Sequence, residues 1–241
     1  RVSSPSAVRR WLRIAAALAR EIRSPRRSPG RGPGQQVENA LRPLPGSTVT
    51  AMVAKWFLRR EPGSAVVHNL ICSRAVPETI LRAGGTPVRT RVGHSFIKGV
   101  MKETGAVFGG EHSGHYYYRD NYRADSGILT MLVLMQVVAE DGRSLSAIRG
   151  EFEPYAQSGE INLQVADPAA AATAVGAAFA DGEQDRVDGL TVSWADRWFN
   201  LRPANTGPVL RLNVGAPDAS GVEELVARVR AVVEEAADAG A

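Results

Sequence analysis

The sequence contains little cysteine, histidine and lysine: its 241 residues include one cysteine, four histidines and three lysines. The single Cys72 cannot form an internal disulfide or a metal-binding cysteine pair, so we expect a small buried side chain in a cytoplasmic protein. No apolar run reaches about 18 residues, so we predict no transmembrane helix and no membrane partner. The hydrophobic fraction of 44% is ordinary for a globular chain of one or two domains.

Positive charge is concentrated at one end. Residues 1–44 carry ten arginines and two acidic residues, a net charge of +8, whereas the other 197 residues carry 19 basic and 23 acidic groups, a net charge of −4. The arginine-rich head, residues 1–46, is also rich in proline and glycine, a composition that does not build a core. A transit peptide or a nucleic-acid-binding arm can have this composition. Because no aromatic residues are interleaved for base stacking, we expect a disordered head and no nucleic-acid partner.

The hydrophobic pattern after the head predicts an α/β protein with two domains. Residues 47–155 are expected to form a parallel-sheet α/β domain, because strands and helices alternate there. The strands are predicted at 65–71, 86–92 and 106–110, and the helices after Ser47 and at 75–85, 95–105, 127–140 and 144–152.

Residues 160–241 are expected to form a smaller α+β domain with a mostly antiparallel sheet. Strands are predicted at 160–165, in "GLTVSW" and "RWFNLRPA", and at 209–216, and helices at 168–180 and 219–236. The turn-rich "EPYAQSG" (153–159) marks the boundary between the domains. We interpret the acidic "DGEQDR" (181–186) as a solvated turn.

Three of the four histidines lie between residues 94 and 115, two of them in "GGEHSGHYYYRDNYRADSG" (109–127). The glycines predict a loop that lets the backbone pass close to a ligand. This loop would follow the third predicted strand, at the carboxyl edge where open α/β sheets bind ligands. A hydrophobic core does not require so many histidines and tyrosines, so we expect a site; capping and turn stabilisation are the structural alternative.

The side chains of this region suit a polar, phosphorylated ligand. Glu111 can accept hydrogen bonds from two sugar hydroxyls, and Ser113 can donate or accept. His94 and His115 can carry protons near neutral pH or hydrogen-bond a phosphate. Lys98 follows His94 by one helical turn and adds a positive charge on the same helix face.

The histidines also permit a metal-site interpretation. His112 and His115 have His-x-x-His spacing and follow Glu111, so imidazole and carboxylate ligands are available. No third ligand stands at a typical zinc spacing, and we expect no metal to be held by these residues. A small metal-dependent hydrolase is nevertheless one hypothesis for function.

A second candidate site is "RPANTGP" (202–208). Arg202, Asn205, Thr206 and the backbone amides of 204–207 can surround a dianionic phosphate. An ordinary hairpin turn would also explain this composition, because asparagine and glycine are favoured in turns.

The motifs "VGHSFIK", "FGGEHSGHYYYRD" followed by "DSG", and "RPANTGP", in that order, resemble the α-D-phosphohexomutases, particularly bacterial phosphomannomutase/phosphoglucomutase. The resemblance covers residues 47 to about 236. It implies that 47–155 correspond to the family's third domain, which contacts sugar hydroxyls, and 160–241 to the fourth, which binds the non-reacting phosphate.

Residue by residue, the resemblance places Glu111 and Ser113 on the sugar-hydroxyl contacts and His94 and His115 on the cleft histidines. It places Arg202, Asn205 and Thr206 on the phosphate loop. Two positions depart from the family pattern. Gly207 stands where glutamate or threonine is common, and Ala204 stands where serine is usual. The hydroxyl lost at Ala204 should weaken phosphate binding, although the arginine and the backbone amides remain.

The family's reaction moves phosphate between the 1- and 6-positions of glucose or mannose through a hexose 1,6-bisphosphate, using a phosphoserine and Mg²⁺. This sequence has no "SGxS"-like nucleophile loop and no "DGDxDR" loop for Mg²⁺ before residue 47. We therefore expect a chain shortened by truncation, frameshift or a mis-called start, inactive alone but able to bind hexose phosphates. The alternative is a non-catalytic sugar-phosphate-binding remnant.

Overall fold

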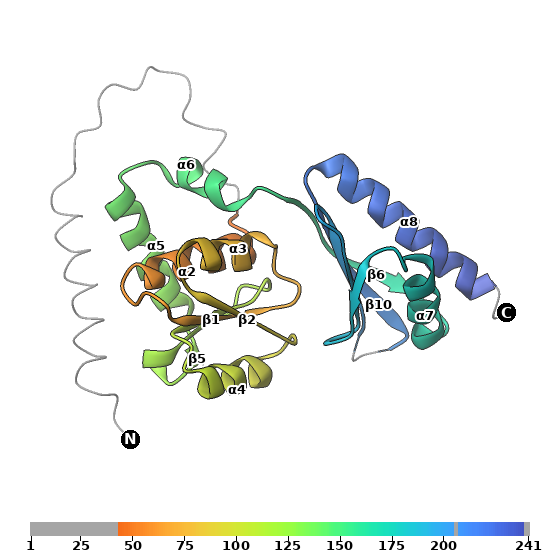
Figure 1. Cartoon of the computed structure of the whole chain (residues 1–241), viewed down its shortest axis with the longest axis horizontal. Coiled ribbons are helices and arrows are strands. Elements are labelled where there is room, and N and C mark those ends of the chain that lie inside the picture. The colour runs from red at the N-terminus through yellow and green to blue at the C-terminus, as the bar shows by residue number, and fades with distance from the viewer. Residues whose placement is uncertain (1–42, 205–206, 239–241) are drawn as a thin grey trace, which may run out of the picture. The chain divides into compact units, whose positions relative to one another are not determined.

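The computed structural model describes residues 43–204 and 207–238 and divides the chain into two units, Arg1–Glu153 and Pro154–Ala241 (Figure 1). The expected disordered head lies outside the described residues up to residue 42, and so do Asn205 and Thr206. Within the described part of the chain, no helix is long and apolar enough to cross a bilayer.

The first unit contains a five-stranded mixed sheet with the order β2-β1-β3-β4-β5. The central strand β1 pairs in parallel with β2 and β3, as the sequence predicts, whereas β4 and β5 are antiparallel additions. The α/β class is thus confirmed, with a mixed rather than a purely parallel sheet. The strands are β1 (Ala65–Asn69), β2 (Thr86–Thr90), β3 (Phe108–Gly110), β4 (Tyr116–Tyr118) and β5 (Ala124–Asp125).

Helices cover both faces of this sheet, as Figure 1 shows for α2 and α3 on one side and α4 on the other. The helices are α2 (Gly46–Leu58), α3 (Ala75–Arg82), α4 (His94–Thr104), α5 (Gly127–Asp141) and α6 (Leu145–Arg149). Two 3₁₀ turns occupy Arg119–Asn121 and Gly150–Phe152.

Strand alternation divides the core of the first unit into two layers. Val66 packs in the cluster with α2, and its neighbour Val67 packs with Ile97 and Met101 of α4. The same period of two separates the tyrosines of β4, because Tyr117 belongs to the α4 layer. The expectation of a continuous loop over 109–127 is therefore wrong. A short turn after β3 reverses the chain, and the tyrosines form a strand with one buried face on each side.

The second unit is an antiparallel sheet with the order β6-β10-β9-β8-β7, packed against two helices. This confirms the predicted α+β pattern. Its strands are β6 (Ala156–Gln164), β7 (Glu183–Asp185), β8 (Leu190–Ser193), β9 (Trp198–Pro203) and β10 (Val209–Ala216), and its helices are α7 (Pro168–Ala178) and α8 (Ala219–Asp238). The interpretation of 181–186 as a solvated turn is wrong in part, since its centre forms the exposed edge strand β7.

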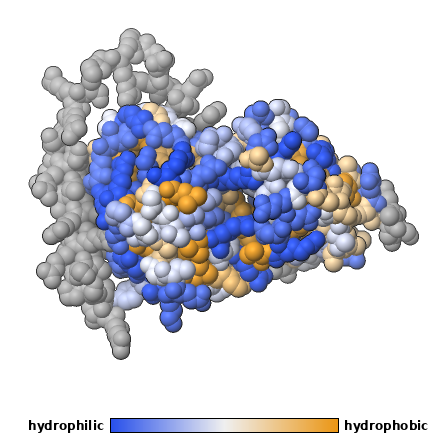
Figure 2. Space-filling model, viewed as in Figure 1, coloured by the Kyte–Doolittle hydropathy of each residue, from blue (hydrophilic) through white to orange (hydrophobic). Residues whose placement is uncertain are grey.

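The sheet of the second unit has one apolar and one polar face. Leu210, Leu212 and Val214 of β10 are buried in the cluster that faces the helices. Arg211 and Asn213 alternate with them and therefore point to the opposite face. In the space-filling view, hydrophilic residues cover much of the visible surface of both units, with smaller hydrophobic patches between them (Figure 2).

Candidate functional site

The loop between β3 and β4 follows the carboxyl end of β3, as predicted. It is closed by hydrogen bonds from the Glu111 amide to the His115 carbonyl oxygen, at 2.9 Å, and from the Gly114 amide to the Glu111 carbonyl oxygen, at 3.1 Å. Gly114 has a φ of 89°, which favours glycine. The start of α2 lies directly against this loop: a Cβ on Gly46 would lie 2.2 Å from the His112 carbonyl oxygen.

Ser47 supports the loop rather than capping α2. The helix begins after Pro45 without a side-chain cap. The Ser47 hydroxyl instead lies 2.9 Å from His112 Nδ1 and accepts a hydrogen bond from the Ser73 amide at 3.0 Å.

Glu111 is buried, with 2% of its surface exposed. Its Oε1 accepts a hydrogen bond from the Tyr117 hydroxyl at 2.6 Å, and its Oε2 accepts one from Asn69 Nδ2 at 3.3 Å. The exposed Ser113 lies 3.5 Å away and makes the longest of the three contacts. A ligand hydroxyl would therefore reach the Glu111 carboxylate most easily by replacing Ser113.

Asn69 presents its amide nitrogen to Glu111 because its oxygen is already used. Asn69 Oδ1 accepts from the Cys72 thiol at 3.1 Å and from the His112 amide at 3.4 Å. Cys72 is buried, as expected, and burial raises its pKa to about 12, so it remains a neutral thiol. In the residue before Asn69, burial lowers the pKa of His68 to about 4, so this histidine is neutral and structural.

His94 and His115 meet at the rim of the site. Their ring centroids are 4.5 Å apart, with an interplanar angle of 67°. His94, the first residue of α4, has its Nδ1 2.5 Å from the Tyr117 hydroxyl oxygen. His115 has its Nδ1 2.7 Å from Asp125 Oδ2.

Asp125 is held in its charged form. Burial raises its pKa, but the hydrogen bonds from the Tyr116 amide, at 2.8 Å, and from His115 outweigh burial, so the pKa lies below its ordinary value. The exposed Lys98 adds a positive charge to this cluster, with its Nζ 6.0 Å from the centroid of the Tyr117 ring. The structure thus brings together all five residues predicted in this unit: His94, Lys98, Glu111, Ser113 and His115.

Sequence reasoning missed Asn69, Tyr117 and Asp125 as members of this cluster. Asn69 is the polar residue that ends the apolar run "AVVHN", a signal for the carboxyl end of a central strand. Asp125 stands in the "DSG" motif. Tyr117 could have been placed only by recognising "YYY" as a strand, whose middle residue faces away from the other two.

The metal-site interpretation has no geometric support. His112 is engaged with Ser47, and His115 with Asp125, so the two imidazoles have different partners. Among residues 43–204 and 207–238, no group of three or more His, Cys, Asp or Glu side chains could hold a metal ion. The described residues therefore do not fit the Mg²⁺ that the resemblance implies.

The second unit places Arg202 on β9, near its carboxyl end. Its side chain is 12% exposed, and its Nη2 donates to Glu160 Oε2 at 3.0 Å. Arg211 is paired with Arg202 across the sheet and lies 3.4 Å from the other Glu160 oxygen. The Nε atoms of both arginines are buried without a hydrogen-bond partner. Two guanidinium groups and one carboxylate leave one excess positive charge for an anion.

The structure describes the residues on either side of Asn205 and Thr206. The Ala204 amide donates to the Val209 carbonyl oxygen at 2.8 Å, and Gly207 has a φ of 92°. The left-handed conformation at Gly207 explains glycine at this position, where a side chain would be strained. The glutamate or threonine that the resemblance implies at this position would have to adopt another backbone conformation.

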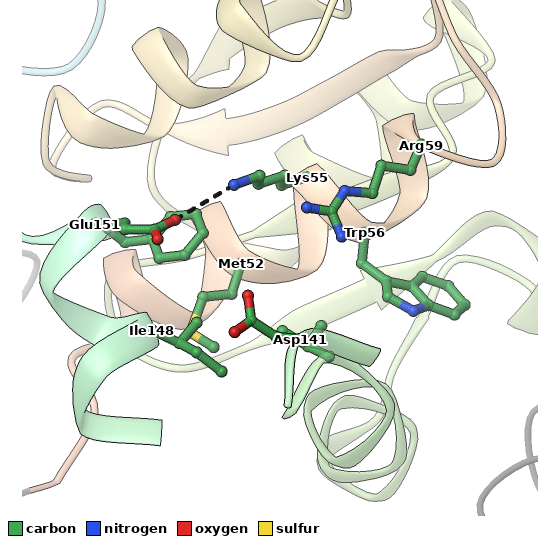
Figure 3. A pocket seen from close by; sticks show the side chains of 9 residues that line it. Met52, Lys55, Trp56, Arg59, Asp141, Ile148 and Glu151 are labelled. Carbon is green, nitrogen blue, oxygen red and sulfur yellow. Dashed lines mark hydrogen bonds and ion pairs between the residues drawn. The ribbon is translucent and has the colours of Figure 1, made fainter. Parts of the chain in front are cut away.

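Two pockets of the first unit are lined by residues other than the predicted ones. One, of about 20 Å³, lies beside α2 and is lined by Met52, Lys55, Asp141 and Ile148 among others, with an ion pair between Lys55 and Glu151 at 3.5 Å (Figure 3). Another, of about 450 Å³, shares Lys55 and Glu151. Because the histidines form an exposed rim, we assign the candidate site to the loop and not to these cavities.

Comparisons with known proteins match both units. Residues 45–155 match the family model for phosphoglucomutase/phosphomannomutase α/β/α domain III, and residues 160–232 match that for the phosphoglucomutase/phosphomannomutase C-terminal domain. A phosphomannomutase of Methanocaldococcus jannaschii is 37% identical over 190 residues, which are 79% of this chain and 42% of the relative. A phosphomannomutase of Salmonella montevideo is 41% identical over 174 residues, or 71% and 38% of the two chains.

Solved structures show the same similarity. A phosphoglucomutase/phosphomannomutase family protein of Burkholderia thailandensis superposes with a TM-score of 0.69 at 26% identity, covering 80% of this chain and 42% of that one. An Aspergillus fumigatus N-acetylphosphoglucosamine mutase, solved with GlcNAc-6P and magnesium, shares the fold with a TM-score of 0.62 at 14% identity, covering 83% and 45%. The chain spans about two fifths of the length of the curated relatives it matches.

Proposed function

The chain belongs to the α-D-phosphohexomutase family, and from this membership we propose that it binds hexose phosphates: its first unit contacts sugar hydroxyls, and its second unit contacts phosphate. One observation carries the proposal. Four polar or charged side chains, from two segments of the sequence, lie together at one rim of the first sheet: His94, Lys98, Glu111 and His115. That the Aspergillus fumigatus neighbour was solved with GlcNAc-6P supports a sugar phosphate as the ligand class.

Each residue has a role in this proposal. Glu111 and Ser113 contact sugar hydroxyls, since the carboxylate is an acceptor and the serine is the group a ligand can replace. His94 and His115 hydrogen-bond the ligand and hold or move a proton through Nε2, because the Nδ1 atom of each is already bound within the protein. Lys98 and Arg202 provide positive charge for phosphate, and Asn205 and Thr206 are proposed to complete the second site.

In the whole enzyme, we propose that these groups hold the substrate of an isomerase that moves phosphate between the 1- and 6-positions of a hexose, through a hexose 1,6-bisphosphate. Phosphoryl transfer requires a nucleophile that carries the group and a cation that neutralises developing charge. This sequence contains neither the serine loop nor the aspartate loop for Mg²⁺. We therefore propose that the chain alone binds without turnover. A cytoplasmic location belongs to the same proposal, since the single thiol suits a reducing compartment.

Calorimetric titration of the full chain with glucose 6-phosphate, glucose and inorganic phosphate tests this function. The expected result is binding of glucose 6-phosphate that Glu111→Gln and Arg202→Ala each weaken, with Arg202→Ala alone weakening inorganic phosphate. A chain that binds none of the three ligands, or variants that do not distinguish sugar from phosphate, would contradict the assignment. A coupled assay from glucose 1-phosphate distinguishes a shortened enzyme from a non-catalytic sugar-phosphate-binding remnant. The assay is run with the N-terminal domains of a family enzyme added. The remnant should bind but show no activity even then.

A further inference from the structure

We infer that Tyr117 is a positioning residue that, with Glu111, holds His94 in the tautomer with its proton on Nδ1, leaving the Nε2 lone pair for a ligand hydroxyl. The inference rests on the proposed function only for the identity of that ligand. The tautomer itself follows from hydrogen bonds within the first unit.

The fold places the Tyr117 hydroxyl between two partners. Strand β4 directs Tyr117 to the α4 side of the sheet, where it is completely buried beside Ile97 and Met101. Its oxygen lies 2.6 Å from Glu111 Oε1 and 2.5 Å from His94 Nδ1. The phenol therefore bridges a carboxylate and an imidazole that do not bond to each other.

Counting protons decides which group donates in each bond. A tyrosine hydroxyl has one hydrogen, and an ionised carboxylate can only accept. The Tyr117 hydrogen therefore belongs to the bond with Glu111, and His94 must donate from Nδ1 to the phenol oxygen. Burial first, and then the Glu111 hydrogen bond and charge, raise the pKa of Tyr117 far above its ordinary value, so the phenol keeps its proton.

The reverse assignment would require Glu111 to be a proton donor. Its second oxygen accepts from Asn69 Nδ2, whose orientation is fixed because Asn69 Oδ1 accepts from Cys72 and from the His112 amide. Donors thus approach both carboxylate oxygens, as expected for an ionised group. This arrangement keeps Glu111 an acceptor.

Asp125 orients the His115 ring in the same way, by a direct hydrogen bond. The His115 Nδ1 donates directly to Asp125, whereas His94 reaches a carboxylate through the phenol. Glu111 and Lys98 both approach Tyr117, the partner of His94, and the charge of Asp125 interacts with His94. With both Nδ1 atoms used internally, the neutral pair presents two Nε2 acceptors, an arrangement that suits the hydroxyl donors of a sugar.

Nitrogen-15 NMR of the histidines in the full chain tests the tautomer. Spectra recorded above about pH 8, where an ordinary imidazole is neutral, should show His94 protonated on Nδ1, with His94→Gln giving the assignment. Tyr117→Phe keeps the ring and removes the hydroxyl, so His94 should lose its Nδ1–H preference. Glucose 6-phosphate affinity should fall several-fold while inorganic phosphate binding is unchanged.

Tyr118→Phe is the matched control. It removes a buried hydroxyl that lies 2.6 Å from Thr130 Oγ1, in the core layer of α2, whereas Tyr117 lies in the layer of α4, so the His94 spectrum should not change. A His94 protonated on Nε2 in the parent chain, or an equal shift in both tyrosine variants, would overturn the inference. If the tautomer responds as expected but no sugar phosphate binds, the proposed function fails and the positioning role of Tyr117 stands.

Discussion

Replacing Glu160 with glutamine should strengthen phosphate binding by the second unit. The Glu160 carboxylate on β6 contacts Arg211 on the adjacent strand β10 at 3.4 Å and Arg202 on the next strand, β9, at 3.0 Å. It therefore occupies donors that a phosphate at Arg202 would use. Glutamine is similar in size and keeps one carbonyl oxygen to accept from a guanidinium group, so Glu160→Gln removes the negative charge and little else.

The size of the effect follows from the exposure of these groups. The side chains of Glu160 and Arg211 are 35% and 34% exposed, so solvent screens their interaction, and such ion pairs are worth about 0.2–1 kcal/mol. Two like charges about 5 Å apart in water repel by about 0.8 kcal/mol before salt screening. Relief of this repulsion and freeing of the arginine donors together favour binding by about 1 kcal/mol, an affinity gain of about fivefold.

Isothermal titration of inorganic phosphate into the full chain measures this gain, at low and at high salt. The gain should shrink at high salt because the repulsion is electrostatic. Glu183→Gln is the matched control, since Glu183 is an exposed acid on β7, at the opposite edge of the same sheet. It makes the same change in net charge and should leave phosphate affinity nearly unchanged.

Weaker phosphate binding by Glu160→Gln would refute this reasoning. It would mean that the Glu160 carboxylate mainly orients Arg202. This orientation would then increase phosphate affinity by more than competition between the carboxylate and phosphate reduces it. An equal gain in Glu160→Gln and Glu183→Gln would attribute the effect to net charge instead of to the arginine pair.

Three further predictions concern the two units. Glu111→Gln should weaken glucose 6-phosphate binding by about 1–3 kcal/mol, the range for charge-assisted hydrogen bonds, and spare inorganic phosphate in calorimetry; equal weakening of both would contradict the sugar-contact role. Folding lowers the pKa of Asp125, so its contribution to stability is present above its ordinary pKa of about 3.9 and is lost as pH falls through the lower folded value. In urea unfolding measured at a series of pH values, Asp125→Asn should therefore lose less stability at acid pH than the parent chain. An equal loss in both chains would exclude this contribution. The purified chain should give no turnover in a glucose 1-phosphate assay with Mg²⁺ and glucose 1,6-bisphosphate; activity that Glu111→Gln abolishes would show that the missing loops are not needed.

Local pattern determined the elements and their class in both units. Buried strands such as "AVVHN" and the glycine-closed helix before β2 follow from apolar periodicity and end signals, which are properties of neighbouring residues. The sequence also predicted that the candidate residues of the first unit lie near one another, as they do in the structure. His94, Glu111 and His115 follow consecutive elements of a βαβ unit, whose carboxyl-edge loops are brought together by the parallel topology.

Tertiary structure alone decided which atoms meet. Nothing in "HYYY" distinguishes the three tyrosines until β4 pairs with β3, after which the pleat sends Tyr117 to His94 and Glu111 and sends Tyr118 to Thr130. Likewise, Glu160 lies 42 residues from Arg202 in sequence, and their contact arises from the pairing of β6 and β9 with the two sides of β10. Short-range propensity carries no information about such pairs, because register between distant strands depends on the packing of the whole sheet. The chemistry of the site therefore depends on contacts that the local sequence could not specify.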